Sequence, residues 1–184
     1  MMGLPYPIPG EETRIQMRVS NSVFIATAAC ADTVDAAKEF IKRMRQEHPK
    51  ASHHVYAFIV GYGDSVIEGC HDDGEPSGTA GRPVLAVLRG SGLGDAAVVV
   101  TRYFGGTKLG TGGLVRAYSE AARAVLDALP RVQKIERQQI DLTLPYACYA
   151  SLRRLIEKFE GQVVEEQFGA EVRVRLSLPI ELLE

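Results

Sequence analysis

Apolar residues recur along this chain with two periods, one typical of strands and one typical of helices. Residues 14–19 alternate polar and apolar side chains, as a half-buried strand does, and residues 23–30 continue as a more apolar strand. Residues 36–44 then carry apolar side chains at helical spacing, just after Asp32 and Thr33, which are residue types that cap helices. The pattern predicts two strands followed by a helix.

The middle of the chain continues with the same two periods. Residues 53–60 and 65–69 predict a pair of strands joined by a turn. Residues 84–88 suit a short buried helix, and residues 96–100 are apolar throughout, which is typical of a central strand covered on both faces. A long helix is predicted from Gly113 to Leu129.

A second cycle of the pattern begins near residue 138. Apolar residues alternate, then recur at helical spacing, then alternate twice more, which predicts a β-α-β-β unit. The ranges are 140–144, 152–159, 163–168 and 172–178.

These two cycles predict two domains, with a boundary near residues 130–137. We expect an N-terminal α/β domain at residues 1–134 and a small β-α-β-β domain at residues 135–184. A β-α-β-β-α-β domain would need another helix and strand, or a partner that covers the sheet. Residues 180–184 are expected to form the first turn of that helix.

Composition narrows the classes of function. The net charge of −2 excludes a broad basic field for nucleic acid, so any such contact must be local. Cys30, Cys70 and Cys148 are odd in number and far apart, which argues against a disulfide framework or a zinc site; Cys30 and Cys148 are expected in the core. With neither a signal peptide nor an 18-residue apolar run, a cytoplasmic protein without a membrane span is expected.

The segment with the clearest chemical signal joins the apolar strand at residues 96–100 to the long helix. Its glycines allow a ligand to approach the main chain, and a helix N-terminus attracts anions. Lys108, Arg102 and Arg116 add positive charge. The segment matches neither a P-loop nor a dinucleotide fingerprint, and glycines that serve a tight turn are the competing interpretation. The expected anion-binding residues are Arg102, Gly105, Gly106, Thr107, Lys108, Gly110, Thr111, Gly112, Gly113 and Arg116.

An acidic segment forms a second candidate. Asp72, Asp73 and Glu75 could hold a divalent cation, pair with the arginines, form a solvated turn, or accept hydrogen bonds from the glycine segment. The turn and ion-pair interpretations are favoured, and no metal or cofactor is expected. His53 and His54 begin a strand and must point to opposite faces, so one of them could face the glycine segment.

Two segments resemble the signature of the IMPACT family and of its bacterial YigZ-type members. They are Asp72–Pro83 and Val98–Ser119; the pair His53-His54 also matches, although Val55 replaces a cysteine often found there. Residues 138–180 resemble the small C-terminal domain of the bacterial members. The resemblance implies an α+β protein, with a two-layer α/β sandwich of the ribosomal-protein-like class followed by a ferredoxin-like domain.

The resemblance also implies a function. Eukaryotic relatives regulate translation by competing for an activator of a kinase that phosphorylates an initiation factor. Bacteria lack that kinase, so we expect a binding module associated with RNA or the ribosome and linked to translation regulation, with an anion site at residues 105–113. An enzyme acting on a phosphorylated small molecule and a regulator that binds a protein partner are the alternatives, and an oligomer stays open.

Overall fold

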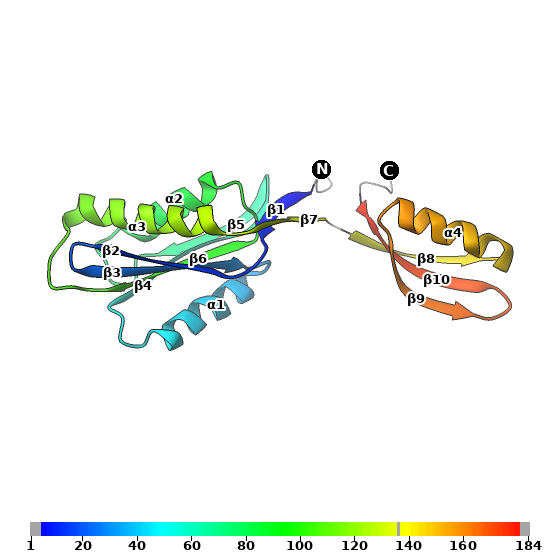
Figure 1. Cartoon of the computed structure of the whole chain (residues 1–184), viewed down its shortest axis with the longest axis horizontal. Coiled ribbons are helices and arrows are strands. Elements are labelled where there is room, and N and C mark those ends of the chain that lie inside the picture. Colours follow the sequence, from blue (N-terminus) through cyan, green and yellow to red (C-terminus); the bar gives the residue numbers. More distant parts are fainter. Residues whose placement is uncertain (1–4, 136, 181–184) are drawn as a thin grey trace. The chain divides into compact units, whose positions relative to one another are not determined.

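The computed structural model describes residues 5–135 and 137–180, which form two compact units (Figure 1). The first unit runs from Pro7 to Gln133. The second contains the chain from Lys134 onward and groups with Tyr6, which the sequence analysis assigned to the first domain. A short sheet pairs β1 (Tyr6–Pro9) with β7 (Arg131–Lys134), two strands that the apolar pattern did not predict.

The first unit is built on a five-stranded sheet of order β2-β3-β6-β4-β5, in which each neighbouring pair is antiparallel. The central strand β6 is buried from Ala96 to Arg102, as its apolar run predicted. The strands are β2 (Thr13–Val19), β3 (Ser22–Cys30), β4 (His53–Tyr62), β5 (Ser65–His71) and β6 (Ala96–Tyr103).

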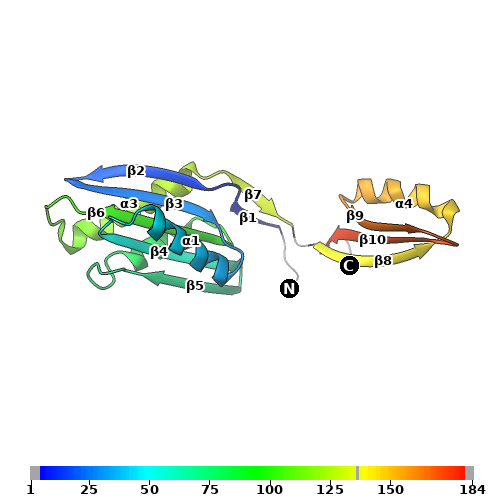
Figure 2. The ribbon, with the colours of Figure 1, turned by 90° about the horizontal axis from the view of Figure 1, so that it is seen from below.

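Helices cover both faces of this sheet (Figures 1 and 2). Helix α1 (Val34–Glu47) lies on one face, and α2 (Gly81–Gly90) and α3 (Gly110–Ala128) lie on the other. Val98 belongs to the core under α2 and α3, whereas Val99 belongs to the core under α1, because successive strand residues point to opposite faces.

The α+β class is confirmed, with one more layer than the two that the family resemblance implied. The additional layer forms because the apolar stripe of α1, which includes Phe40 and Met44, needs an apolar surface to cover. The apolar run of β6 at residues 96–100 provides that surface on its second face, through Ala97 and Val99.

The first residues of α1 and α3 show how the local sequence sets where a helix begins. Thr33 caps α1 as expected, with its Oγ1 accepting a hydrogen bond of 3.1 Å from the backbone N–H of Ala36. Helix α3 begins at Gly110 rather than at Gly113, so the second half of the predicted glycine loop is the first turn of the helix. Residues 110–113 therefore contribute amides that are already aligned along the helix axis.

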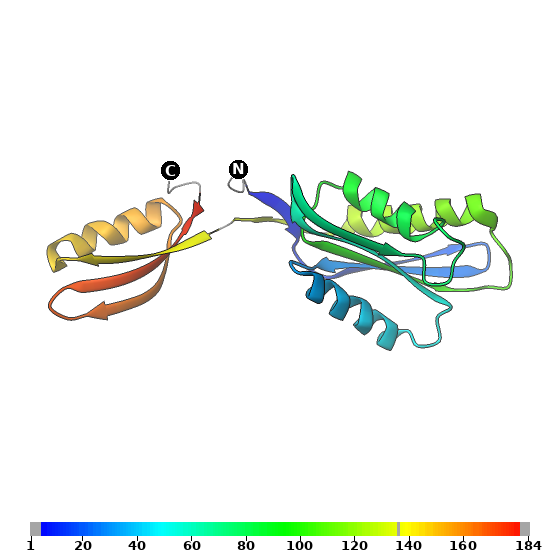
Figure 3. The same ribbon diagram turned by 180° about the vertical axis from the view of Figure 1, so that it is seen from behind.

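The second unit has the predicted β-α-β-β order. Its antiparallel sheet has the order β8-β10-β9, and α4 lies along one face (Figure 3). The third strand of this unit lies between the first two, and the first three strands of a ferredoxin-like domain are arranged in the same way. The helical turn expected at residues 180–184 falls mostly on 181–184, outside the described residues. The elements are β8 (Arg137–Leu144), α4 (Tyr146–Lys158), β9 (Gln162–Phe168) and β10 (Val172–Pro179).

The cysteines lie differently from expectation. All three carry thiols rather than disulfides, but Cys30 and Cys148 are exposed, so their assignment to the core was wrong. Cys30 is the last residue of β3, beyond the packed part of the strand, and Cys148 lies in the first turn of α4, whose buried residue is Ile156. None of the helices in residues 5–135 and 137–180 is long and apolar enough to cross a membrane.

Candidate functional site

Strand register creates the site. His53 at the start of β4 pairs directly with Arg102 near the end of β6, so both side chains lie on the face that α2 and α3 cover. The segment that follows β5 brings Glu75 to the same place, and the first turn of α3 closes it. Four separate parts of the first unit thus meet around one pocket.

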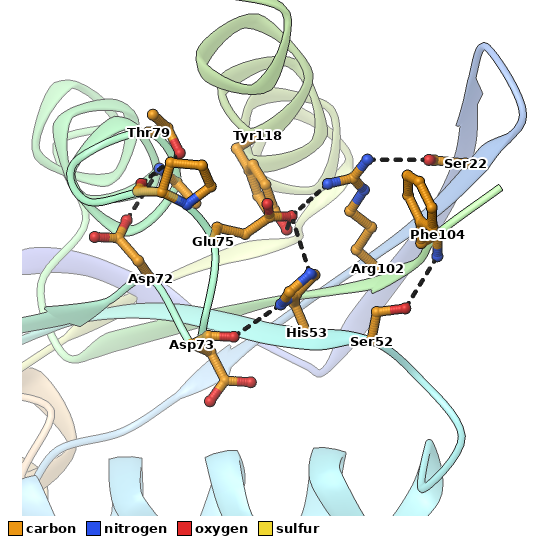
Figure 4. A network of polar contacts seen from close by, with 12 residues as sticks. Ser22, Ser52, His53, Asp72, Asp73, Glu75, Thr79, Arg102, Phe104 and Tyr118 are labelled. Carbon is orange, nitrogen blue, oxygen red and sulfur yellow. Dashed lines mark hydrogen bonds and ion pairs between the residues drawn. The ribbon is translucent and has the colours of Figure 1, made fainter. Parts of the chain in front are cut away.

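Glu75 is the centre of a buried polar network (Figure 4). Its Oε1 accepts hydrogen bonds from Arg102 Nη1 at 2.6 Å and from the Tyr118 hydroxyl at 2.8 Å, and His53 Nε2 lies 3.7 Å away. The side chains of Glu75 and Arg102 are each 4% exposed. Burial, together with the hydrogen bond to Glu75, raises the pKa of the Tyr118 phenol, which therefore stays a donor. Of the alternatives for the acidic segment, Glu75 takes the internal ion pair.

Arg102 has one donor that the network does not use. Nη2 donates to Ser22 Oγ at 3.2 Å, whereas Nε is buried and no hydrogen-bond acceptor serves it within the described part of the chain. The guanidinium lies 5.3 Å from the buried ring of Phe24 and 5.4 Å from the half-exposed ring of Phe104. Arg102, expected as a direct anion contact, is thus mainly committed to the protein's own groups.

Asp72 holds the start of α2. Its carboxylate accepts hydrogen bonds from the backbone N–H groups of Gly78, Ala80 and Gly81, at 2.8 to 3.0 Å. Burial by itself would raise the pKa of Asp72, but these three bonds outweigh it and lower the pKa below its usual value. The residue acts as a helix cap from nine residues upstream of the first helical residue.

Asp73 ties the same segment to the histidines and to α1. Its Oδ1 accepts from Arg45 Nη2 at 2.7 Å, and its Oδ2 accepts from the backbone N–H of His54 at 2.7 Å. The carbonyl oxygen of Asp73 lies 2.9 Å from His53 Nδ1. Because a carbonyl can only accept, Nδ1 donates to it, and Nε2 is the ring nitrogen that faces Glu75.

The two histidines point to opposite faces, as predicted. His53 lines the pocket, whereas His54 is buried elsewhere and its Nε2 donates to the carbonyl of His48 at 3.1 Å. Burial lowers the pKa of His54. Only His53 of this pair is placed to meet a ligand.

The pocket itself has a volume of about 440 Å³. One wall is apolar, from Pro76, Leu109 and Leu114, and the exposed Lys108 lies beside the first turn of α3. Within the described residues, no side chain caps the N-terminus of that helix. The lining residues are His53, Glu75, Pro76, Arg102, Phe104, Lys108, Leu109, Gly110, Thr111 and Leu114.

The predicted anion-binding residues divide between this pocket and its surroundings. Lys108, Gly110 and Thr111 line it together with His53, Glu75 and Arg102. The backbone N–H of Gly105 already donates to Ser22 Oγ at 3.3 Å. Outside the lining lie Gly106, Thr107, Gly112, Gly113 and Arg116, of which Arg116 is exposed on α3.

Sequence reasoning did not assign roles to the two serines that support the site. Ser22 is 80 residues from Arg102 in sequence, and Ser52 Oγ accepts from the backbone N–H of Phe104 at 3.2 Å. Neither residue belongs to a motif, so the sequence holds no local signal for them. Their roles arise from the pairing of β3 and β4 with β6.

Comparison with known proteins identifies the family. The model of the Impact N-terminal domain matches residues 20–126, and the chain is 39% identical over 173 residues to the IMPACT family member YigZ of Escherichia coli K12, covering 94% of this chain and 85% of that protein. The chain belongs to the IMPACT family. Residues 142–184 of this IMPACT family protein match a domain of unknown function, DUF1949.

Two further relatives agree with that assignment. An IMPACT family member of Haemophilus influenzae Rd is 36% identical over 180 residues, which cover 97% of this chain and 87% of that protein. A crystal structure described as that of a hypothetical protein superposes with a TM-score of 0.75 at 38% identity, over 98% of this chain and 88% of that one. Both domains of this IMPACT family protein therefore have counterparts in proteins of similar length.

Proposed function

We propose that this IMPACT family protein is an RNA-binding module linked to translation regulation, and that it holds RNA phosphate at the first turn of α3. The observation that carries the proposal is the pocket at the N-terminus of this helix, where Lys108, Gly110 and Thr111 lie together. Unpaired amides and the helix dipole favour an anion at such a position, and the lysine adds a full charge. The link to translation rests on the family resemblance.

Gly112 is exposed beside the pocket, one residue beyond the lining residue Thr111. It is the third residue of α3, its φ is not in the left-handed region, and a Cβ added there would meet no protein atom within 4 Å among the described residues. A glycine inside a helix costs up to about 1 kcal/mol relative to alanine. The fold does not require glycine here, whereas close approach of a ligand to the backbone would.

Gly105 shows the opposite case. A Cβ at this position would lie 1.9 Å from the carbonyl oxygen of Asn21, so the turn between β6 and α3 needs a glycine for steric reasons. Packing thus explains Gly105, whereas no packing contact among the described residues explains the glycine at position 112.

The charge of the protein limits the size of the contact. With a net charge of −2 and few cations at the pocket, we expect contact with one or two phosphates rather than with a long stretch of backbone. Each phosphate neutralised on a single strand contributes a slope of about −0.7 to the dependence of log affinity on log salt. A shallow salt dependence is therefore part of the proposal.

The test is equilibrium binding of a labelled single-stranded RNA to the full chain. Binding is measured by fluorescence anisotropy at KCl concentrations between about 50 and 300 mM. Binding should weaken with salt, and Lys108→Ala should weaken it further and reduce the slope by about one phosphate contact. Lys42→Ala is the matched control, because Lys42 is exposed on α1 on the other face of the sheet. Binding that is absent, or that Lys108→Ala leaves unchanged, would overturn the proposal.

A further inference from the structure

The pocket at α3 has features that an internal RNA phosphate would not use. We propose that it binds the terminal phosphate monoester of a nucleotide, with the phosphate at the first turn of α3 and the base against Phe104. The inference rests on the proposed function and narrows it, from RNA phosphate in general to the end of a strand or a free mononucleotide.

The phosphate end of the pocket offers more donors than one diester oxygen needs. Lys108, Gly110 and Thr111 line the same pocket, so the first-turn amides of α3, an ammonium and a hydroxyl belong to its wall. A phosphate monoester carries a charge between about −1.5 and −2 near neutral pH and has three acceptor oxygens, whereas an internal diester carries a single charge. The monoester therefore matches both the number of donors and the positive potential of the helix terminus.

Arg102 is a second, independent observation that points to a ligand. Its side chain is 4% exposed, it lines the pocket, and its Nε lacks an acceptor among residues 5–135 and 137–180. Buried polar groups without a protein partner are rare in folded proteins, and a bound ion or water molecule is one of the reasons for such a group. Because Glu75 balances the charge of Arg102, a dianion beside the pair meets a nearly neutral floor rather than a repulsive carboxylate.

The rest of the pocket suits a ring. Pro76, Leu109 and Leu114 form an apolar wall, and Phe104 is 48% exposed. Both the backbone and the side chain of Phe104 have a partner. Its backbone N–H donates to Ser52 Oγ, and the guanidinium of Arg102 lies over its ring. An exposed aromatic ring in a fixed orientation is the platform on which proteins stack a nucleobase. A volume of about 440 Å³ lies in the range of small-molecule sites.

The same residues argue against a site that binds the middle of an RNA strand. Proteins that track single strands combine a groove of several cations with successive aromatic platforms. Among the lining residues of this pocket, Lys108 is the exposed lysine or arginine and Phe104 is the aromatic residue. One cation beside a helix terminus and one ring make a site for a single nucleotide.

The experiment compares ligands that differ only at their ends. Short oligoribonucleotides of one sequence, carrying a 5′-phosphate, a 3′-phosphate or hydroxyls at both ends, are titrated into the full chain by calorimetry, next to AMP, adenosine and inorganic phosphate. We expect a phosphorylated end to improve affinity about tenfold or more, the effect of adding one or two charge-assisted hydrogen bonds. AMP should compete with that oligoribonucleotide, and adenosine should not.

Two variants separate the two parts of the pocket. Phe104→Ala should weaken AMP about tenfold through lost stacking and leave inorganic phosphate unchanged. Phe168→Ala, at an exposed aromatic residue of the second unit, is the matched control and should bind as the unaltered protein does. Lys108→Ala alters an exposed side chain, so it should fold normally, and it should weaken AMP and inorganic phosphate alike.

The outcomes distinguish this inference from the proposed function. Preference for one phosphorylated end supports the inference and identifies that end, and binding of AMP without any RNA supports the subsite while overturning the RNA-binding proposal. Equal affinity for phosphorylated and hydroxyl-ended RNA, without competition by AMP, overturns the inference and leaves RNA binding in place. Absence of binding by every probe overturns both.

Discussion

Glu75 Oε1 lies 2.6 Å from Arg102 Nη1, between two side chains that are each 4% exposed. This pair joins the segment after β5 to the central strand β6, and the hydroxyl of Tyr118 adds α3 to the same carboxylate. The floor of the pocket is therefore a fixed, charge-balanced unit. Its low-dielectric surroundings make the loss of either partner costly.

Replacing Glu75 should destabilise the protein strongly. Glu75→Gln keeps the shape of the side chain but leaves the Arg102 guanidinium buried without a counter-charge, and breaking a buried pair in this way costs about 3–5 kcal/mol in the free energy of unfolding. Urea denaturation monitored by circular dichroism measures the loss. A change below about 1 kcal/mol, as is usual for exposed ion pairs, would contradict the prediction.

A double-mutant cycle isolates the pair. Because Arg102→Met in the Glu75→Gln background removes the orphaned charge, the double variant should lose clearly less stability than the two single variants added together. Additivity within about 0.5 kcal/mol would show that the two residues act independently.

Asp72→Ala should loosen the start of α2. The substitution removes the acceptor of three backbone N–H groups, and loss of a helix cap alone costs about 0.5–2 kcal/mol. Hydrogen exchange at the amides of Gly78, Ala80 and Gly81 should accelerate. Asp64→Ala, in the exposed turn between β4 and β5, is the matched control and should change neither stability nor exchange by a comparable amount.

The same aspartate should contribute an acid-sensitive part of the stability. Burial alone would raise the pKa of Asp72, but the three backbone bonds lower it in the folded protein, so the stability it adds is complete above the unfolded pKa of about 3.9. That contribution falls as the pH drops from there through the lower folded pKa. The difference in unfolding free energy between the unaltered protein and Asp72→Asn should shrink over this window, and a difference that stays constant on acidification would contradict the assignment.

His54 should make the protein sensitive to mild acid. Burial lowers its pKa in the fold, so below the unfolded value of about 6.5 the unfolded chain binds a proton that the folded chain does not. Stability should therefore fall as the pH decreases from about 6.5 towards the folded pKa. His54→Gln should flatten the unfolding free energy in this range, and an unchanged pH dependence in the variant would exclude His54 as the cause.

Two glycine-to-alanine substitutions should change the free energy of unfolding in opposite directions. Gly105→Ala places a Cβ 1.9 Å from a backbone oxygen of Asn21, and the forced shift should cost at least about 1–3 kcal/mol. Gly112→Ala meets open space inside α3 and should raise the free energy of unfolding by about 0.5–1 kcal/mol. Thermal denaturation of both variants measures the contrast; a destabilised Gly112→Ala would show that the fold itself requires this glycine.

Features that depend on neighbours in the chain were well predicted from the sequence. The cap of Thr33 on α1, the buried character of β6 and the β9–β10 hairpin all follow from residue type and spacing within a few positions. The start of α3 was placed three residues late because Gly110 to Gly113 have low helix propensity, which the helix overcomes through the packing of Leu114 and Tyr118 against the sheet.

By itself, the sequence determined which segments are strands and helices, that the chain has two cycles of them, and where glycine and positive charge gather, since each of these is a property of nearby residues. The tertiary structure alone decided which partner each charge takes: Glu75 pairs with Arg102, Asp72 holds the start of α2, and Asp73 meets Arg45. The reason is that electrostatic pairing depends on distance in space and on burial. Both are set by the register of β4 against β6, which no spacing along the chain specifies.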